Sequence, residues 1–147
     1  MAELLNDDVK SQIREVFEQL KEPVQVLFFG RTTDCEYCED TRQLVEEVTA
    51  LSDQLTLAVH DLDQDADIAS QYRVDKTPGL VVAGLDGDQV IDYGIRYSGI
   101  PSGHEFTSLI HDLVLVSSRD SGLRENTRQL LSKLSTPIHL QVFVTPT

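Results

Sequence analysis

The stretch Cys35-Glu36-Tyr37-Cys38 decides the fold, because of what stands on either side of it. Before it, residues 24–29 form a short, almost entirely apolar run, which is typical of a buried strand. After it, apolar residues recur at helical spacing over about 36–51, at Leu44, Val45, Val48 and Leu51. Two cysteines in the first turn of a helix lie close enough for a disulfide, since their Cα atoms are within about 7 Å. The arrangement predicts a redox-active C-x-x-C pair.

The two cysteines are expected to have different roles. A helix N-terminus offers unpaired N–H groups and the positive end of a dipole, and both stabilise a thiolate. We expect Cys35 at the exposed start to attack a substrate disulfide, and Cys38, one turn further in, to resolve the mixed disulfide. A zinc site and a structural pair without chemistry are the alternatives. Zinc is disfavoured because it needs four ligands, and the four histidines lack ligand spacing: His60, His104, His111 and His139.

The sequence on both sides of the C-x-x-C pair predicts further helices and strands. Apolar periodicity predicts a helix over about 7–21, a strand over 55–61, a short helix over 65–72 and a strand over 80–83. Asp86-Gly87 is a hairpin signal before a strand over 89–93, and Ser102-x-x-Glu105 predicts a capping box that opens another helix. We expect an α/β fold: a central mixed sheet with helices on both faces, parallel neighbours from both β-α-β crossovers and an antiparallel hairpin edge.

Thr77-Pro78 lies between the short helix and the next strand. Proline seldom enters a strand, because it cannot donate to the ladder, and an X-Pro bond in such a place is a candidate for the cis form. A cis bond beside the dithiol would leave the Thr77 backbone free to pair with an extended substrate. An ordinary trans turn is the alternative.

The C-terminal part does not fit this unit. Leucines predict a helix over about 123–134, and Pro137 precedes an apolar stretch over 138–144 that predicts a strand. The same order of helix, proline and strand occurs around Pro23, which suggests an internal repeat. We therefore expect one unit over 1–118 and a helix-strand extension over 119–147 that starts a second repeat. An unpaired strand favours association, so it should pair with the first unit or form a homodimer with a second copy.

Composition narrows the function classes. The chain has 147 residues, with 12 Lys+Arg against 25 Asp+Glu and a formal net charge of −13, which disfavours nucleic-acid and anionic-membrane partners. This acidic, lysine-poor balance suits either a salty interior or simple solubility. No apolar run approaches the ~20 residues of a membrane helix, and the N-terminus has no secretory-signal pattern. These observations predict a cytoplasmic protein.

Together the motifs resemble the thioredoxin superfamily and, more narrowly, the N-terminal unit of the glutaredoxin-like protein disulfide oxidoreductases. The resemblance rests on four segments: the C-x-x-C pair, residues 75–78, residues 94–106 and the terminal Val142-Phe143-Val144-Thr145-Pro146-Thr147. Members of that family carry two thioredoxin-fold units in tandem, and the second dithiol follows a stretch like the last one. The resemblance implies thiol–disulfide exchange on protein disulfides without an organic cofactor or metal, and a thioredoxin-reductase-like electron donor. It also implies substrate contacts from Tyr37, Thr77 and Pro78.

Two departures from related families matter. Thioredoxins hold a buried acid six residues before the first cysteine, where this chain has Phe29; Asp61, at a strand end, is the candidate substitute as proton acceptor. The Gly-Gly…Asp patch that grips glutathione in glutaredoxins is missing, which does not support glutathione binding. The alternative function is a non-catalytic docking or dimerisation module whose catalytic partner unit is missing.

Charge around the dithiol leads to one more expectation. Four carboxylates lie within five residues of Cys35, namely Asp34, Glu36, Glu39 and Asp40. Nearby negative charge disfavours a thiolate. Arg31 is the only basic residue in the approach loop, and Arg42 is expected to face outward. We expect Cys35 to be a sluggish nucleophile for its class, and salt to speed its reaction.

Overall fold

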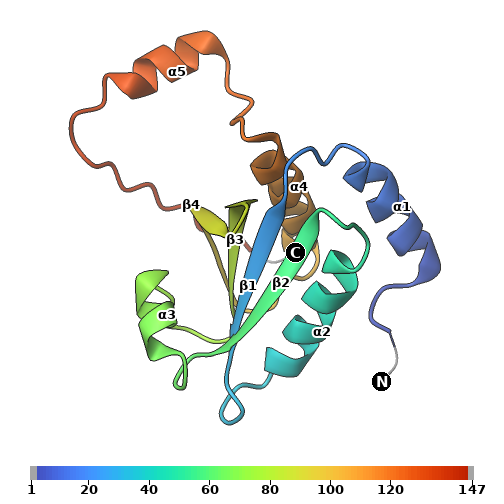
Figure 1. The fold of residues 1–147 in the computed structure, drawn as a ribbon. Coiled ribbons are helices and arrows are strands. Elements are labelled where there is room, and N and C mark those ends of the chain that lie inside the picture. The colour runs from blue at the N-terminus through green and yellow to red at the C-terminus, as the bar shows by residue number, and fades with distance from the viewer. Residues whose placement is uncertain (1–2, 146–147) are drawn as a thin grey trace.

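A four-stranded sheet in the order β2-β1-β3-β4 runs through the molecule, which the computed structural model describes over residues 3–145 (Figure 1). The strands are β1 Val24–Gly30, β2 Leu55–Asp61, β3 Gly79–Asp86 and β4 Gln89–Ser98. The helices are α1 Asp7–Phe17, α2 Cys38–Thr49, α3 Ala66–Gln71, α4 His104–Ser118 and α5 Glu125–Ser132. The predicted α-β-α-β-α-β-β-α order is confirmed up to α4, with β3 and β4 longer than expected.

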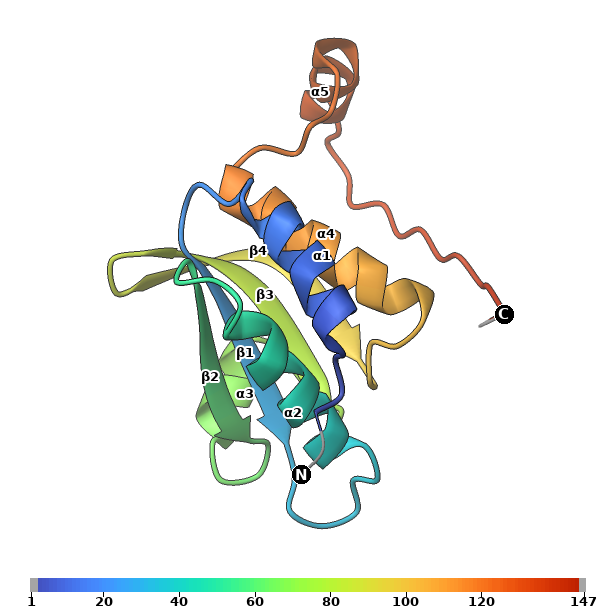
Figure 2. The same ribbon diagram turned by 90° about the vertical axis from the view of Figure 1, so that its right-hand side faces the viewer.

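Helices cover both faces of the sheet, as predicted. On one face lie α1, α2 and α4 (Figure 2). Their apolar residues form one buried cluster with Val24, Val26 and Phe28 of β1. On the other face, the short helix α3 covers Leu27 and Phe29. Because consecutive residues of β1 are buried on opposite faces, its sequence is apolar at every position except Gln25 rather than alternating.

The expectation that both crossovers give parallel neighbours is wrong for the second one. β1 and β2 are parallel, but β3 lies on the other side of β1 and runs antiparallel to it. Gly30 pairs with Asp61 and Phe29 pairs with Gly79, so the chain leaves β2 and enters β3 at the same end of the sheet. The six residues of α3 span only about 9 Å. That is too short to carry the chain back along a strand of about 23 Å.

The start of α4 also differs from the expectation. The N-cap is Gly103, whose φ of 59° is left-handed, and no side chain caps the helix. Glu105 N donates to the backbone oxygen of Ser102 instead, so the predicted capping box is not formed. The turn at Gly103 takes Ser102 out of the N-cap position, which explains the difference. The hairpin prediction is confirmed, since β3 and β4 are antiparallel and Gly87 has a φ of 58°.

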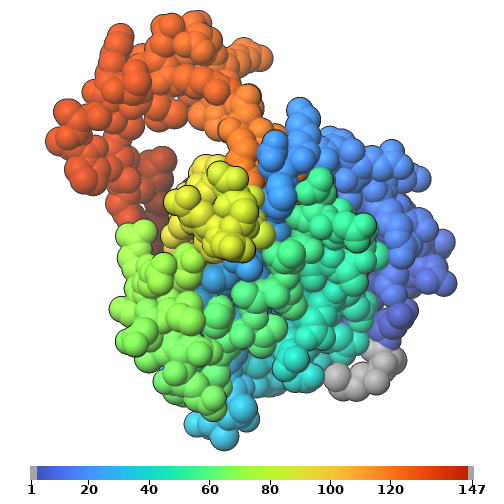
Figure 3. Space-filling view, in the orientation of Figure 1, coloured from blue at the N-terminus to red at the C-terminus, as the bar shows by residue number. Residues whose placement is uncertain are grey.

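The C-terminal extension lies apart from the sheet. Helix α5 forms as expected, but residues 133–145 contain no strand, so the strand predicted over 138–144 is wrong for the single chain. Neither edge strand, β2 nor β4, pairs with this segment, and a strand needs a ladder partner. Every residue from 120 to 145 is exposed, and Figures 2 and 3 show this part as an arm that stands off the rest of the molecule. Within residues 3–145, no helix is both long and apolar enough to span a membrane.

Candidate active site

The two cysteines form a disulfide that joins the loop before α2 to the first residue of that helix. Their Cα atoms are 5.5 Å apart. The helix begins at Cys38, two residues later than expected, with Tyr37 as its N-cap. The Tyr37 carbonyl accepts hydrogen bonds from the backbone N–H of Thr41 (3.0 Å) and from its hydroxyl (2.6 Å). Cys35 is partly exposed and Cys38 is buried, with 7% of its surface accessible. Cys35 is therefore the more accessible of the two cysteines.

The end of β1 forms the floor under the inner sulfur. The backbone N–H of Arg31 donates to the Cys38 sulfur at 3.4 Å. A Cβ at position 30 would lie 2.7 Å from the Phe28 ring and 3.5 Å from the Cys38 sulfur. Only glycine fits between the ring and the dithiol, so Gly30 lets the chain pass this close to the sulfur.

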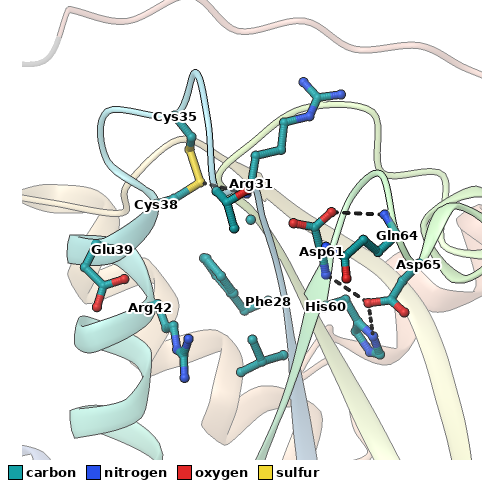
Figure 4. A pocket seen from close by; sticks show the side chains of 13 residues that line it. Phe28, Arg31, Cys35, Cys38, Glu39, Arg42, His60, Asp61, Gln64 and Asp65 are labelled. Atoms are coloured by element: carbon teal, nitrogen blue, oxygen red, sulfur yellow. Dashed lines mark hydrogen bonds and ion pairs between the residues drawn. A yellow bond between two sulfur atoms is a disulfide. The ribbon is translucent and has the colours of Figure 1, made fainter.

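A pocket of about 610 Å³ opens beside the disulfide, between α2 and the ends of β1 and β2 (Figure 4). It is lined by Phe28, Gly30, Arg31, Thr32, Cys35, Cys38, Glu39, Arg42, Val59, His60, Asp61, Gln64 and Asp65. Arg42, which was expected to face outward, lines this pocket and pairs with Glu46 at 2.8 Å. Of the residues predicted for the site, the pocket brings together Cys35, Cys38 and Asp61.

Asp61 lies at the end of β2, across the pocket from the dithiol (Figure 4). It pairs with Gly30 in the parallel ladder, and its side chain is on the same face as Phe28 and Cys38 because the two strands are in register. One carboxylate oxygen accepts the backbone N–H groups of Asp63 and Gln64, both at 3.0 Å. These bonds fix the orientation of the carboxylate.

A network of charged side chains surrounds the mouth of the pocket. The Arg31 guanidinium donates two hydrogen bonds of 2.9 Å to the carboxylate of Asp63, and this pairing raises the pKa of Arg31. Asp65 accepts the backbone N–H of Asp61 at 2.9 Å and lies 3.5 Å from Nδ1 of His60. The loop after β2 therefore presents carboxylates that are held by hydrogen bonds.

The Thr77–Pro78 peptide bond is cis, as predicted. Pairing of Gly79 with Phe29 places this turn at the same end of the sheet as the dithiol. Gly99 N donates to the Pro78 carbonyl at 2.8 Å, whereas no hydrogen bond within residues 3–145 engages the backbone of Thr77. Neither residue lines the pocket, and neither does Tyr37, which is 48% exposed. These three lie outside the cavity that holds Asp61.

The position that holds an acid in thioredoxins is apolar here. Phe29 is fully buried on the α3 face and stacks on His60 with ring centroids 5.1 Å apart. Among the residues described, no three His, Cys, Asp or Glu side chains form a group that could hold a metal ion.

Sequence reasoning missed the partnership of Arg31 with Asp63, and it missed Gly30 and the pocket side of Arg42. The Arg31–Asp63 pair could have been predicted only from the pairing of two strands that are distant in sequence. Two parallel neighbouring strands end at the same edge of a sheet, so residues just beyond Gly30 and Asp61 must come close together.

The fold and the disulfide-bonded C-x-x-C pair define a thioredoxin-like disulfide oxidoreductase fold. The thioredoxin domain family matches residues 23–111, and the chain belongs to this family. A protein disulfide oxidoreductase from Aeropyrum pernix K1 is 30% identical, with a TM-score of 0.74 over 88% of this chain and 55% of that one.

The alkyl hydroperoxide reductase AhpF is a second kind of relative. Its Enterococcus faecalis structure is 26% identical, with a TM-score of 0.77 over 88% of this chain and 61% of that one. The corresponding Staphylococcus aureus protein is 26% identical over 144 residues, which are 98% of this chain and 25% of that protein. The chain thus spans a quarter of the length of this curated relative.

Proposed function

We propose that this chain carries out thiol–disulfide exchange on protein disulfides, with Cys35 as the nucleophile and Cys38 as the resolving thiol. The observation that carries the proposal is the unequal exposure of the two cysteine residues, since Cys35 is partly exposed and Cys38 is buried. Membership of the thioredoxin family and the likeness to a protein disulfide oxidoreductase support it.

The reaction balances without any organic cofactor. The Cys35 thiolate attacks one sulfur of a substrate disulfide, forms a mixed disulfide and releases the other substrate sulfur as a thiolate. Cys38 then loses its proton and attacks the Cys35 sulfur, which forms the intramolecular disulfide and releases the second substrate thiolate. Two electrons pass to the substrate, and a reductase-like donor must return them.

Asp61 is proposed as the acceptor of the Cys38 proton. It shares the pocket with Cys38, and only one of its carboxylate oxygens is used by the backbone hydrogen bonds. A carboxylate that shares a pocket with a thiol can take its proton where the two come within hydrogen-bond reach or are bridged by one water. Asp61→Asn should slow release of the substrate from the mixed disulfide at least about tenfold, whereas Asp67→Asn on α3, which does not line the pocket, should leave it unchanged.

Substrate binding is proposed at Tyr37, Thr77 and Pro78. The support is the exposed ring of Tyr37 and the unpaired backbone of Thr77 beside the dithiol end of the sheet. An extended substrate segment can pair with such a backbone as an added strand. The cytoplasm is the proposed location. A dithiol that reduces other proteins must itself be kept reduced, and the cytoplasm keeps thiols reduced.

The acidic rim supports the proposal that Cys35 reacts slowly for its class. Asp34, Glu36, Glu39 and Asp40 are all exposed, and the helix begins only at Cys38. We expect the pKa of Cys35 to lie towards the upper part of the span between a free thiol and the strongly activated cysteines of this fold. Alkylation followed against pH at low and high salt measures it; a midpoint below about 6 without salt dependence would contradict the proposal.

The proposed function is tested by reduction of a protein disulfide with a chemical dithiol as donor. Cys35→Ser should reduce the rate to background, and Cys38→Ser should accumulate mixed disulfides. If Cys35→Ser keeps full activity, or the wild-type protein has none, the alternative of a non-catalytic docking or dimerisation module takes its place.

We propose that residues 119–147 begin a second unit, and that two copies of the chain associate through this segment. The support is the exposure of large apolar residues between positions 130 and 144, namely Leu130, Leu131, Leu134, Ile138, Leu140, Val142, Phe143 and Val144. Exposed apolar surface of this extent marks a contact site.

A further inference from the structure

Arg31 holds two parts of the site at once. Its backbone N–H donates to the Cys38 sulfur at 3.4 Å, and its guanidinium forms two hydrogen bonds of 2.9 Å with Asp63. We propose that the Arg31–Asp63 ion pair is a positioning device, which holds the Arg31 N–H on the Cys38 sulfur and so stabilises the Cys38 thiolate while it resolves a mixed disulfide. The proposal rests on the dithiol exchange proposed above.

The backbone of Arg31 needs an anchor because it lies just beyond the sheet. The ladder between β1 and β2 ends at Gly30. No hydrogen bond within residues 3–145 involves residues 32–34, although this segment leads directly to Cys35 and contains a left-handed residue, Asp34, with a φ of 55°. The side chain of Arg31 is therefore what ties the N-terminal end of the loop to the rest of the protein.

Asp63 is a fixed point to which that loop can be tied. Its backbone N–H donates to Oδ1 of Asp61 at 3.0 Å, and Leu62 N donates to the Gly30 carbonyl at 2.9 Å. Asp65 accepts the N–H of Asp61 at 2.9 Å. The turn after β2 is thus held at several points. The two hydrogen bonds from the guanidinium to Asp63 therefore restrain Arg31 relative to this turn.

The chemical consequence falls on the resolving step. When Cys38 attacks, its proton leaves, the Cys35–Cys38 bond forms, and the substrate sulfur departs with the electron pair of the broken bond. An N–H that points at the Cys38 sulfur favours the thiolate over the thiol. Arg31 N–H makes the only hydrogen bond to either sulfur among the residues described. The other titratable residues that line the pocket with Cys38 are Cys35, Glu39, Arg42, His60, Asp61 and Asp65.

The test separates positioning from simple charge. In a Cys35→Ser background, the ultraviolet absorbance of the Cys38 thiolate is titrated against pH for Arg31→Lys and Asp63→Asn. Lysine keeps the charge but loses the fork, so positioning predicts a higher pKa for Cys38 and about three- to tenfold less thiolate at a given pH below it. Asp63→Asn should raise that pKa as well. Through-space charge alone predicts the opposite sign, since removal of a carboxylate favours a thiolate.

Arg42→Lys is the matched control. Arg42 lines the same pocket and also pairs with a carboxylate, that of Glu46, but its backbone belongs to α2. It should leave the pKa of Cys38 unchanged. A pKa that is unchanged in Arg31→Lys, lowered in Asp63→Asn, or raised equally in Arg42→Lys overturns the proposal.

A second readout uses the intact dithiol. Arg31→Lys should slow release of a substrate protein from its mixed disulfide by the same factor, while the first attack by Cys35 keeps its rate. If both steps slow equally, the ion pair is not a positioning device for Cys38. If the wild-type protein reduces no protein disulfide, the proposed function fails, whereas the titrations in the Cys35→Ser background still decide the role of the ion pair.

Discussion

Residues 3–119, the body, and residues 120–145, the tail, contain similar kinds of apolar side chains and use them differently. In the body, two clusters of buried residues fill both faces of the sheet. In the tail every residue is exposed, and Leu140 and Phe143 are 86% and 88% accessible. A core requires a second layer that covers the apolar side of an element, and the tail has none. The comparison teaches that stability resides in the body, and that the tail offers surface to a partner.

The largest contrast is expected for a pair of leucines. Leu113 in α4 is completely buried and Leu140 in the tail is almost completely exposed. Leu113→Ala should lower the free energy of unfolding by about 2–5 kcal/mol, because it leaves a cavity. Leu140→Ala should change it by less than about 0.5 kcal/mol. Chemical denaturation of both variants measures the difference, and similar losses would show that the tail is packed in solution.

A smaller contrast is expected for a pair of arginines. The Arg119 guanidinium, at the end of α4, donates to the carbonyls of Val116 (2.6 Å), Pro23 (2.8 Å) and Leu85 (3.1 Å). Arg119→Ala removes these three part-buried hydrogen bonds and should cost about 1–3 kcal/mol, although the Pro23 carbonyl keeps the N–H of Leu85 (3.0 Å) and the Val116 carbonyl keeps the N–H of residue 119 (3.1 Å). Arg128 binds only within the tail, to Leu123 and Asp120, so Arg128→Ala should leave unfolding of the body unchanged. Chemical denaturation of both variants measures the difference. Equal losses in Arg119→Ala and Arg128→Ala would contradict the division of the chain into a body and a tail.

A pair of aspartates gives a contrast that depends on pH. Two hydrogen bonds from Arg96 lower the pKa of Asp92 in β4 to about 2. Because the folded pKa is below the ordinary value, Asp92 stabilises the fold above about pH 4 and loses this effect as the pH falls towards about 2. After solvent screening we expect about 1 kcal/mol. The stability difference between the wild type and Asp92→Asn should therefore shrink over that pH range.

Asp120 in the tail is the matched control for Asp92. Its pKa is also lowered, first by the backbone N–H of Gly122 and then by Arg128. These two leading partners belong to the tail, and Lys21 of the body is the smallest of the contributions that lower this pKa. Asp120→Asn should therefore give a much smaller pH-dependent change in unfolding of the body than Asp92→Asn. A change as large as that of Asp92→Asn would mean that the tail and the body unfold as one unit.

Local patterns predicted most of the body. Period-two alternation and turn residues placed β2 at 55–61 and the hairpin at Gly87, and the C-x-x-C spacing and Thr77-Pro78 placed the dithiol and the cis bond. Each of these depends on a few neighbouring residues. The direction of β3 follows from the shortness of α3, which the expectation of a second parallel crossover left out of account.

The candidate site divides in the same way. Cys35, Cys38 and Asp61 were predicted from motif and strand position, and the pocket brings them together. The Arg31–Asp63 pair was missed because it depends on the register of two strands and joins residues that are 32 positions apart in sequence. The strand expected over 138–144 failed for the same physical reason, since a strand is defined by its partner and not by its own apolar pattern.

The smallest effect on stability, and the sharpest test of the comparison, is expected from deletion of residues 123–147. The body keeps its buried clusters and the Arg119 hydrogen bonds without them, so the denaturation midpoint should stay the same within error.

Self-association should fall, because the deletion removes the exposed apolar side chains of the tail. Sedimentation velocity at several concentrations measures this, with Leu140→Asp in the full chain as a control that keeps the tail but reduces its apolar surface. If the deletion lowers stability by more than about 1 kcal/mol, the tail packs against the body in solution. If the full chain stays monomeric at every concentration, the proposed association of two copies is wrong.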